Sequence, residues 1–214
     1  MVRILLADDH TLMRQGLGQI LGQHPDFEVV AEASSGVEAV AAAERLQPDI
    51  AIVDIAMKEL NGIEATAQIA RHSPHTAVLI LSMYSDERYV IRAVKAGARG
   101  YVLKNSAGDE LVAAIQQILH GRAFFSPAVA KVFQDGFTRL RGSQDVEDRF
   151  ELLTERERHV YQLLAEGNSN KDIANLLNLS LHTVETHRSR IMEKLDVHST
   201  AELVLSAVRR GLVT

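Results

Sequence analysis

Short apolar runs and longer amphipathic stretches alternate along the first 120 residues of the chain. Four of the five apolar runs are nearly continuous Val, Ile and Leu, which is typical of parallel strands buried on both faces. The runs are Val2–Ala7, Glu28–Glu32, Ile50–Val53, Val78–Leu81 and Tyr101–Leu103. Stretches with helical periodicity separate or follow them, at Thr11–Gly22, Gly36–Leu46, Gly62–Arg71, Glu87–Ala96 and Gly108–His120. The alternation predicts a doubly wound α/β fold of five parallel strands, with helices on both faces of the sheet.

The pattern changes after residue 150, where only helical periodicity remains. Thr154-x-x-Glu157 is a capping box that opens a first helix, which ends near Gly167. Further helices are predicted at Asn170–Leu177, Leu181–Leu195 and Ser199–Arg210. Residues Asn178 to Ser180 separate the second helix from the third, which is the turn length of a helix-turn-helix. Amphipathic helices of this kind occur in bundles of many functions, so the spacing alone is a weak signal.

These two patterns divide the chain into an α/β domain over residues 1–121 and an all-α domain of four helices over residues 151–214. Residues 122–150 are predicted to form a linker, because Gly136, Gly142 and a polar stretch interrupt the periodicity. A helix near residues 126–138 is expected within this linker, since Pro127 suits a first helical turn.

Composition excludes several classes of site. The chain has no cysteine, which excludes disulfides, thiolate catalysis and cysteine-ligated zinc. Neither His72 with His75 nor His182 with His187 has the i, i+4 spacing of a helical metal pair, so no histidine metal site is predicted. No apolar run approaches the ~20 residues that cross a bilayer, and no signal peptide is evident, so we expect a cytoplasmic protein without a membrane partner.

The net charge of −5 is unusual for a protein that binds nucleic acid. Residues 151–214 are closer to neutral, with 8 Lys and Arg against 9 Asp and Glu. Any affinity of this domain for phosphates must therefore depend on where its cations lie.

Polar side chains follow four of the five predicted strands. Asp8 and Asp9 come directly after the first strand, Asp54 after the third, Ser82 after the fourth and Lys104 after the fifth. Parallel strands in an open sheet bring their carboxyl ends to one edge, where ligands bind. Three carboxylates so close repel one another and need a cation, and oxygen ligands suit Mg²⁺. The arrangement predicts phosphoryl transfer to Asp54, with Mg²⁺ and Lys104 offsetting negative charge and Ser82 hydrogen-bonding a phosphoryl oxygen.

Each of these residues also has an ordinary structural explanation. An aspartate after a strand is commonly a turn former or a helix cap, and a lone lysine is commonly a surface charge. Their coincidence at the strand ends is what favours a site. A hydrolase with an aspartyl-phosphate intermediate is a further alternative, but such enzymes need an acid/base aspartate two residues after the nucleophile, where this chain has Ala56. We therefore do not expect an enzyme.

The segments around these residues resemble a response-regulator receiver domain, which has a flavodoxin-like fold. The similar segments are ILLADDH (4–10), PDIAIVDIAM (48–57), NGIEA (61–65), LS (81–82) and AGARGYVLK (96–104). The resemblance implies that Asp54 is the phospho-acceptor. It also implies that Asp8, Asp9 and Asp54 hold Mg²⁺ together with the backbone carbonyl of Ala56.

The same resemblance implies a conformational switch. Ser82 and Tyr101 would be the switch pair, and Lys104 the lysine that forms an ion pair at the phospho-acceptor. An aromatic residue at a strand end is otherwise ordinary packing. The family often has Pro where this chain has Lys58. One hypothesis is that Lys58 partly occupies the unphosphorylated pocket and weakens Mg²⁺ binding, and the alternative is an outward, solvated lysine.

Residues 153–197 closely resemble a LuxR-type helix-turn-helix, and its union with a receiver is typical of the NarL/FixJ group of response regulators. The resemblance implies that Leu181–Leu195 enters the major groove of DNA. Expected phosphate contacts are Lys171, Thr183, His187 and Arg188, and expected base contacts are Glu185, Thr186 and Ser189. Many relatives carry a basic residue where Glu185 stands, so this Glu would either accept a hydrogen bond from cytosine or repel phosphate. His187 has an equally good explanation as a half-buried packing residue.

The function that these resemblances imply is phosphorylation-dependent regulation of transcription in a two-component system of the bacterial cytoplasm. The implied partners are a cognate sensor histidine kinase, double-stranded promoter DNA and a second copy of the chain once it is phosphorylated. Leu203 and Ala207 share one face of the last helix, which would serve either the dimer contact or ordinary packing. The alternative function is a phosphorylation-controlled protein-interaction module that does not bind DNA, which the near-neutral tail and Glu185 allow.

Overall fold

The computed structural model describes residues 1–131, 149–209 and 212. The chain divides into two compact units, with the division near residue 144. The helix expected near residues 126–138 begins at Pro127, and residues 127–131 are helical. The rest of that expected helix, and most of the predicted linker, lie outside the described residues.

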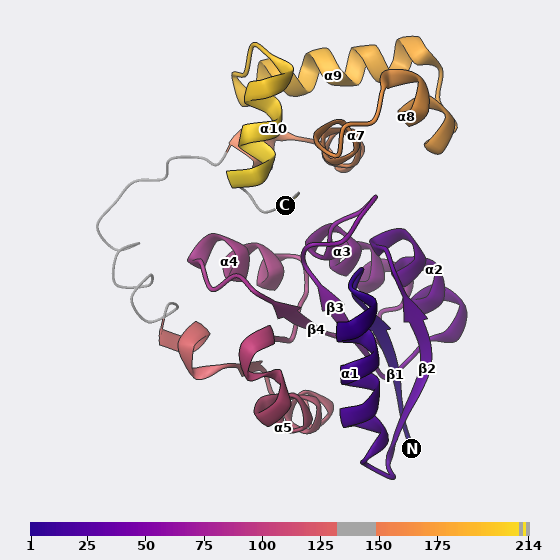
Figure 1. Cartoon of the computed structure of the whole chain (residues 1–214), viewed down its shortest axis with the longest axis vertical. Helices are drawn as coiled ribbons and strands as arrows, with labels where there is room; N and C mark the ends of the chain where they lie inside the picture. Colours follow the sequence, from indigo (N-terminus) through magenta and orange to yellow (C-terminus); the bar gives the residue numbers. More distant parts are fainter. Residues whose placement is uncertain (132–148, 210–211, 213–214) are drawn as a thin grey trace. The chain divides into compact units, whose positions relative to one another are not determined.

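The N-terminal unit is a parallel sheet between two layers of helices (Figure 1). The strands are β1 (Val2–Ala7), β2 (Phe27–Ala33), β3 (Ile50–Asp54), β4 (Ala77–Ser82), β5 (Gly100–Leu103) and β6 (Phe124–Phe125). Their order in the sheet is β2-β1-β3-β4-β5-β6, and every pairing is parallel. From β1 the chain adds β2 on one side, and it then returns to add β3 on the other side of β1. The strand order therefore reverses between β1 and β3, which is where an open α/β sheet offers a binding crevice.

The helices of this unit lie close to their predicted positions. They are α1 (Thr11–Gly22), α2 (Gly36–Leu46), α3 (Gly62–His72), α4 (Glu87–Lys95) and α5 (Ala107–Leu119), with a short 3₁₀ helix η1 (Lys104–Ser106) before α5. Three of them begin at side-chain caps, because Ser35, Asn61 and Asp86 each accept hydrogen bonds from backbone N–H groups of the first turn. Helices α1 and α5 cover one face of the sheet, and α2, α3 and α4 lie on the other (Figure 1).

The prediction of five strands was wrong by one. Phe124–Phe125 forms a sixth strand, β6, beside β5. The N–H of Phe124 donates to the carbonyl of Arg99, and the N–H of Ser126 donates to the carbonyl of Tyr101. A strand of two residues is too short to show the alternation on which a sequence prediction depends.

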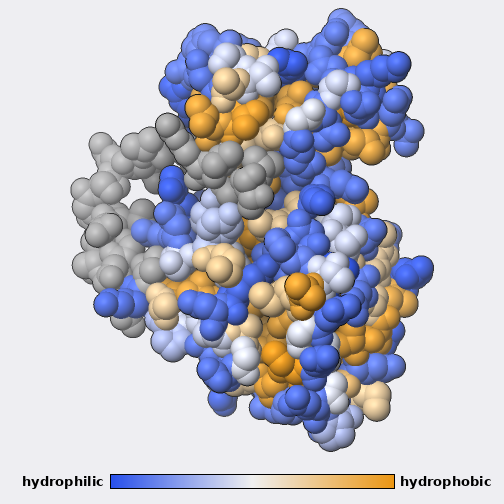
Figure 2. All heavy atoms as spheres, in the orientation of Figure 1, coloured by the Kyte–Doolittle hydropathy of each residue, from blue (hydrophilic) through white to orange (hydrophobic). Residues whose placement is uncertain are grey.

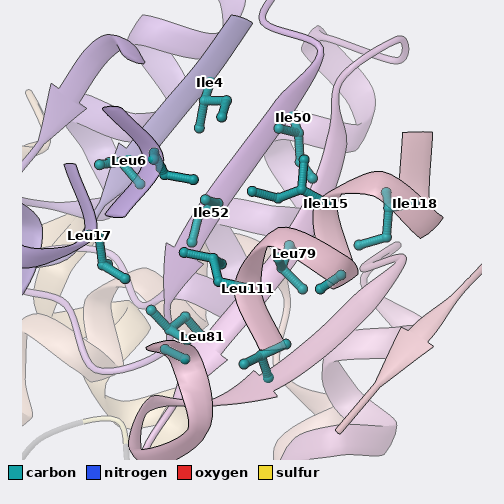
Figure 3. Packing of buried hydrophobic residues seen from close by; sticks show 14 of the residues in the cluster. Ile4, Leu6, Leu17, Ile50, Ile52, Leu79, Leu81, Leu111, Ile115 and Ile118 are labelled. Carbon is teal, nitrogen blue, oxygen red and sulfur yellow. The ribbon is translucent and has the colours of Figure 1, made fainter. Parts of the chain in front are cut away.

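The core between the sheet and helices α1 and α5 is aliphatic. Figure 3 shows side chains from β1, β3 and β4 meeting those of α1 and α5. Alternate strand residues supply this face, as the two-residue repeat of a strand requires. The labelled side chains, all buried, are Ile4, Leu6, Leu17, Ile50, Ile52, Leu79, Leu81, Leu111, Ile115 and Ile118. This packing holds the three central strands rigid, and the polar residues at their carboxyl ends are held with them.

The C-terminal unit is helical throughout its described residues. It contains a 3₁₀ helix η2 (Arg149–Leu152) and the helices α7 (Glu155–Ala165), α8 (Asn170–Leu176), α9 (Leu181–Leu195) and α10 (Thr200–Arg209). The predicted capping box is present, because Thr154 accepts from the N–H of Glu157 and the Glu157 carboxylate accepts from the N–H of Thr154. Ser180 caps α9 by accepting from the N–H of Thr183. Helices α8 and α9 form the helix-turn-helix.

The buried face of α10 belongs to the core of the C-terminal unit. Leu203 and Ala207 are 1% and 0% exposed, and they pack in one cluster with Val184 and Ile191 of α9. The hydroxyl of Tyr161 also bonds to Ser206 on α10. Of the two roles expected for Leu203 and Ala207, ordinary packing is therefore correct.

The surface in Figure 2 is largely hydrophilic, with small hydrophobic patches on both units. No helix among the described residues combines the length and the apolar composition needed to span a bilayer.

Candidate functional site

The strand register brings the predicted pocket residues to one edge of the sheet. Asp54 ends β3 opposite Leu81 of β4, and Ser82 ends β4 opposite Leu103 of β5, directly before Lys104. Asp8 and Asp9 follow β1, which pairs with β3. The side chains of Asp8, Asp54 and Lys104 are 3%, 3% and 5% exposed, so this edge is a pocket with buried charges.

The ammonium group of Lys104 lies between two carboxylates. Its Nζ is 2.6 Å from Oδ2 of Asp54 and 2.7 Å from Oδ2 of Asp8. A buried carboxylate pair without such a cation would be strongly unfavourable. Lys104 thus supplies one positive charge against the three aspartates of the pocket.

The pKa values of these groups show how strongly they are coupled. Burial raises the pKa of Asp54 to about 6, with a smaller contribution from Asp8, although the ammonium group of Lys104 and the N–H of Ala56 oppose the shift. Burial alone would lower the pKa of Lys104, but the two carboxylates outweigh it and the net shift is upward. Near neutral pH the pocket therefore holds an ionised Asp54 beside a charged Lys104.

The remaining charges of the pocket fit a divalent cation. Single ligand atoms of Asp8, Asp9, His10 and Asp54 all lie within 4.8 Å of one another. Oδ2 of Asp8 lies 2.7 Å from Nζ of Lys104, and Oδ1 of Asp9 lies 2.7 Å from Nδ1 of His10. Three carboxylates beside one ammonium group leave an excess of negative charge, which a divalent cation would offset. The oxygen-rich set suits Mg²⁺.

The loop after β3 is built around Asn61 and Gly62. Oδ1 of Asn61 accepts from the N–H groups of Ile63 and Glu64, which caps α3. The N–H of Gly62 donates to the carbonyl of Ile55. A Cβ at Gly62 would lie 1.9 Å from the backbone carbonyl oxygen of Asp54, so only glycine fits there. The NGIEA segment therefore packs closely against the backbone of Asp54.

The expected switch residues meet at the backbone of Tyr84. Tyr101 is 0% exposed, and its hydroxyl donates to the carbonyl oxygen of Tyr84 at 2.6 Å. The hydroxyl oxygen of Ser82 accepts from the N–H of the same residue at 3.1 Å. Burial raises the pKa of Tyr101, and a hydrogen bond with Ser82 opposes this rise. The ring of Tyr84 stacks on Tyr89 of α4, which ties this loop to α4.

Lys58 does not supply the cation between the aspartates. Its side chain is exposed, and the ammonium group between Asp8 and Asp54 belongs to Lys104. The outward, solvated alternative describes Lys58 better than the hypothesis that it occupies the pocket.

The helix-turn-helix places the predicted DNA contacts on and beside α9. Lys171, Glu185 and Ser189 are exposed, whereas Thr183, Thr186, His187 and Arg188 are partly buried. The buried stripe of α9 consists of Val184, Ile191 and Leu195. The opposite, exposed face also includes Arg190, which the sequence analysis did not single out.

Several of the predicted contact residues already bond within the unit. The hydroxyl of Thr186 donates to the carbonyl of His182 in its own helix. The guanidinium of Arg188 donates to the hydroxyl of Thr200, the first residue of α10, at 2.7 Å. Nδ1 of His187 is buried and has no hydrogen-bond partner among the described residues, which favours the packing explanation for this ring.

Comparison with known proteins identifies both units. The response regulator receiver domain matches residues 4–116, and the LuxR family of bacterial regulatory proteins matches residues 151–207. The chain therefore belongs to the response regulators of the NarL/FixJ group, which join a receiver domain to a LuxR-type helix-turn-helix domain. The family and fold predicted from the sequence are confirmed, apart from the additional strand.

Relatives match along the whole chain. The oxygen regulatory protein NreC of Staphylococcus carnosus is 37% identical over 215 residues, which cover 99% of both chains. The response regulator protein VraR of Staphylococcus aureus is 34% identical over 212 residues, again with 99% of both chains covered. The structure of the response regulator RcsB in complex with DNA is 26% identical, with a TM-score of 0.59, and covers 97% of this chain and 98% of that chain.

Proposed function

We propose that this protein is a phosphorylation-dependent transcriptional regulator of the bacterial cytoplasm. Asp54 accepts a phosphoryl group from a cognate sensor histidine kinase, and the phosphorylated protein binds double-stranded promoter DNA through α9 as a homodimer. The observation that carries the proposal is the pair of buried salt bridges that Lys104 forms with Asp8 and Asp54 at the sheet edge. The same chain also has a LuxR-family domain. The RcsB–DNA complex among the similar structures supports the second half.

The proposed chemistry is nucleophilic transfer to a carboxylate. An oxygen of Asp54 attacks the phosphorus of a phosphohistidine, a P–O bond forms, and the P–N bond breaks with the imidazole as leaving group. Asp8, Asp9, Asp54 and the backbone carbonyl of Ala56 would hold Mg²⁺, which supplies positive charge beside the phosphoryl oxygens. Lys104 keeps its ion pair with the modified residue. Stoichiometric modification, and not enzymatic turnover, is the expected outcome.

The switch follows from the contacts of Tyr84. Phosphorylation adds about −1.5 to −2 charge next to Ser82 and Lys104. In the unphosphorylated protein the N–H of Tyr84 donates to the hydroxyl oxygen of Ser82. When this hydroxyl donates a hydrogen bond to a phosphoryl oxygen, it moves and pulls the backbone of Tyr84 with it. Because Tyr101 holds the carbonyl of the same residue, the loop and both switch side chains move together. The face formed by α4, β5 and α5 changes as a result.

Recognition of DNA uses the exposed side of α9. In a helix-turn-helix the second helix enters the major groove, and a dimer meets two half-sites about one helical turn apart. Lys171, Thr183, His187 and Arg188 are the proposed phosphate contacts, and Glu185, Thr186 and Ser189 the proposed base contacts. Since residues 151–214 carry 8 Lys and Arg against 9 Asp and Glu, the affinity for DNA should depend on few phosphate contacts and fall moderately with salt.

The test of this function uses the full chain and its Asp54→Ala variant. Each protein is incubated with Mg²⁺ and a small-molecule phosphoryl donor, and intact mass spectrometry reads the gain of one phosphoryl group. Bound fragments are then selected from genomic DNA at a stated salt concentration, with and without the donor. We expect donor-dependent labelling and DNA enrichment only for the wild type. Labelling without enrichment would favour the protein-interaction alternative, and no labelling would overturn the proposal.

A further inference from the structure

The exposed side of α9 is organised around one row of residues. The helix packs on its unit through the buried stripe of Val184, Ile191 and Leu195. Each residue turns an α-helix by about 100°, so a row displaced by two residues from this stripe lies almost opposite to it. The members of this outer row are exposed except Thr186, which is partly buried, and they are His182, Thr186, Ser189 and Glu193.

His182 begins the outer row, as the second residue of α9. Its carbonyl accepts from the hydroxyl of Thr186 at 2.9 Å, but its imidazole makes no hydrogen bond to any residue that the structure describes. In helix-turn-helix proteins the N-terminal residues of the recognition helix are the ones that contact base edges. His182 therefore combines an uncommitted polar side chain with the part of the helix that meets the bases.

Two neighbouring contact residues are already engaged within the unit. The hydroxyl of Thr183 shares a hydrogen bond with that of Ser180 at 2.7 Å, which belongs to the cap of α9. The guanidinium of Arg188 donates to Thr200 of α10. Thr183 and Arg188 must exchange an existing hydrogen bond for one to DNA, whereas the His182 ring has none to give up among the described residues.

The chemistry of the imidazole selects the base that it can recognise. At least one ring nitrogen of a histidine carries a hydrogen, whether the ring is neutral or protonated. In the major groove guanine presents two acceptors, N7 and O6, whereas adenine presents one acceptor beside a donor. We propose that His182 is a specificity-determining residue that donates a hydrogen bond to a guanine in each half-site. This inference rests on the proposed function, because it requires α9 to enter the major groove.

The experiment compares the full-length wild type with His182→Ala, His182→Gln and His198→Ala. His198 is an exposed histidine of the same unit that lies between α9 and α10, so its variant controls for loss of any histidine. Glutamine is chosen because it bonds to N6 and N7 of adenine. Each protein, treated with Mg²⁺ and a phosphoryl donor, selects duplexes from a random library at one salt concentration. Sequencing gives the base preference at each position, and fluorescence anisotropy gives the affinity for the wild-type site.

We expect the wild type and His198→Ala to select the same motif. His182→Ala should lose the preference for guanine at one base pair of each half-site and bind the wild-type site on the order of tenfold more weakly. His182→Gln should prefer adenine at that base pair. An unaltered motif in His182→Ala would overturn the inference, even if affinity fell uniformly for all sequences, as loss of a phosphate contact or of packing would cause. No selection by the wild type would overturn the proposed function as well.

Discussion

Replacing Lys104 by Met tests whether the ion pair holds the pocket together. The substitution keeps the length of the side chain but removes the cation that lies 2.6 Å from Asp54 and 2.7 Å from Asp8. Removing one partner of a buried ion pair typically costs about 3–5 kcal/mol, because the other charge stays buried and unpaired. In the variant Asp8 still accepts a hydrogen bond from the backbone N–H of His10, and Asp54 still accepts one from the backbone N–H of Ala56. We therefore expect a loss near the lower limit, about 3 kcal/mol.

The loss should depend on pH in a defined direction. A carboxyl group with a raised pKa in the folded protein keeps its proton after the unfolded chain has lost it, so its contribution to stability falls as the pH rises. The pKa of Asp54 is already raised to about 6, and without Lys104 it rises further. The destabilisation relative to wild type should therefore be largest near pH 8 and smaller near pH 5.

Hydrogen exchange read by mass spectrometry on the full chain measures this stability within the receiver. Peptides that contain β3 and β5 report on the strands that carry the two partners. Lys95→Met is the control, because Lys95 is an exposed lysine of the same unit and surface substitutions typically change stability by less than about 0.5 kcal/mol. Added Mg²⁺ should restore part of the loss by binding only the folded protein. A Lys104→Met protein as stable as the control at pH 8 would refute the compensation argument.

Three other substitutions follow from single contacts. In Gly62→Ala the new Cβ overlaps the carbonyl oxygen of Asp54. We expect the free energy of unfolding to fall by at least about 2 kcal/mol and labelling of Asp54 in the mass-spectrometric assay to be slower. Labelling at the wild-type rate would contradict this. Lys194→Met should cost about 1–2 kcal/mol, since it removes the ammonium 2.6 Å from Glu157. Burial alone would raise the pKa of Glu157, but Lys194 and the capping box lower it overall. The stability lost in Lys194→Met should therefore shrink as the pH falls through the pKa of Glu157, which denaturant titrations at several pH values measure. Arg188→Ala should reduce the slope of DNA affinity against salt by about 1, and an unchanged slope would exclude a phosphate contact.

The sequence predicted most of the fold because strongly patterned segments carry it. The continuous aliphatic runs and the helical stretches lie within one or two residues of the observed elements, and Asn61, Thr154 and Ser180 cap helices where turn chemistry places them. The strand that was missed, β6, has two residues and is specified by its backbone pairing with β5. Short elements of this kind depend on tertiary contacts, which no local pattern records.

The site was predictable in its members but not in its contacts. Strand ends at one edge of a parallel sheet bring Asp8, Asp54 and Lys104 together whatever the details of packing. The contact of the His10 ring with Asp9 and the bond from Arg188 to Thr200 depend on side-chain rotamers. Spacing arguments therefore found the carboxylates but not these side-chain contacts.

The burial of Asp54 explains why its modification would move the loop after β4 in particular. Asp8 and Lys104 already make short contacts and follow strands held by the aliphatic core, so they have little freedom to adjust to new charge. Ser82 is different, because its hydroxyl oxygen accepts a backbone N–H that belongs to a loop. Added negative charge in a buried pocket strengthens any hydrogen bond donated to it. Ser82 is therefore the donor that can move toward a phosphoryl group on Asp54. The backbone of Tyr84 would move with it, and so would Tyr101, whose hydroxyl donates to the carbonyl oxygen of Tyr84.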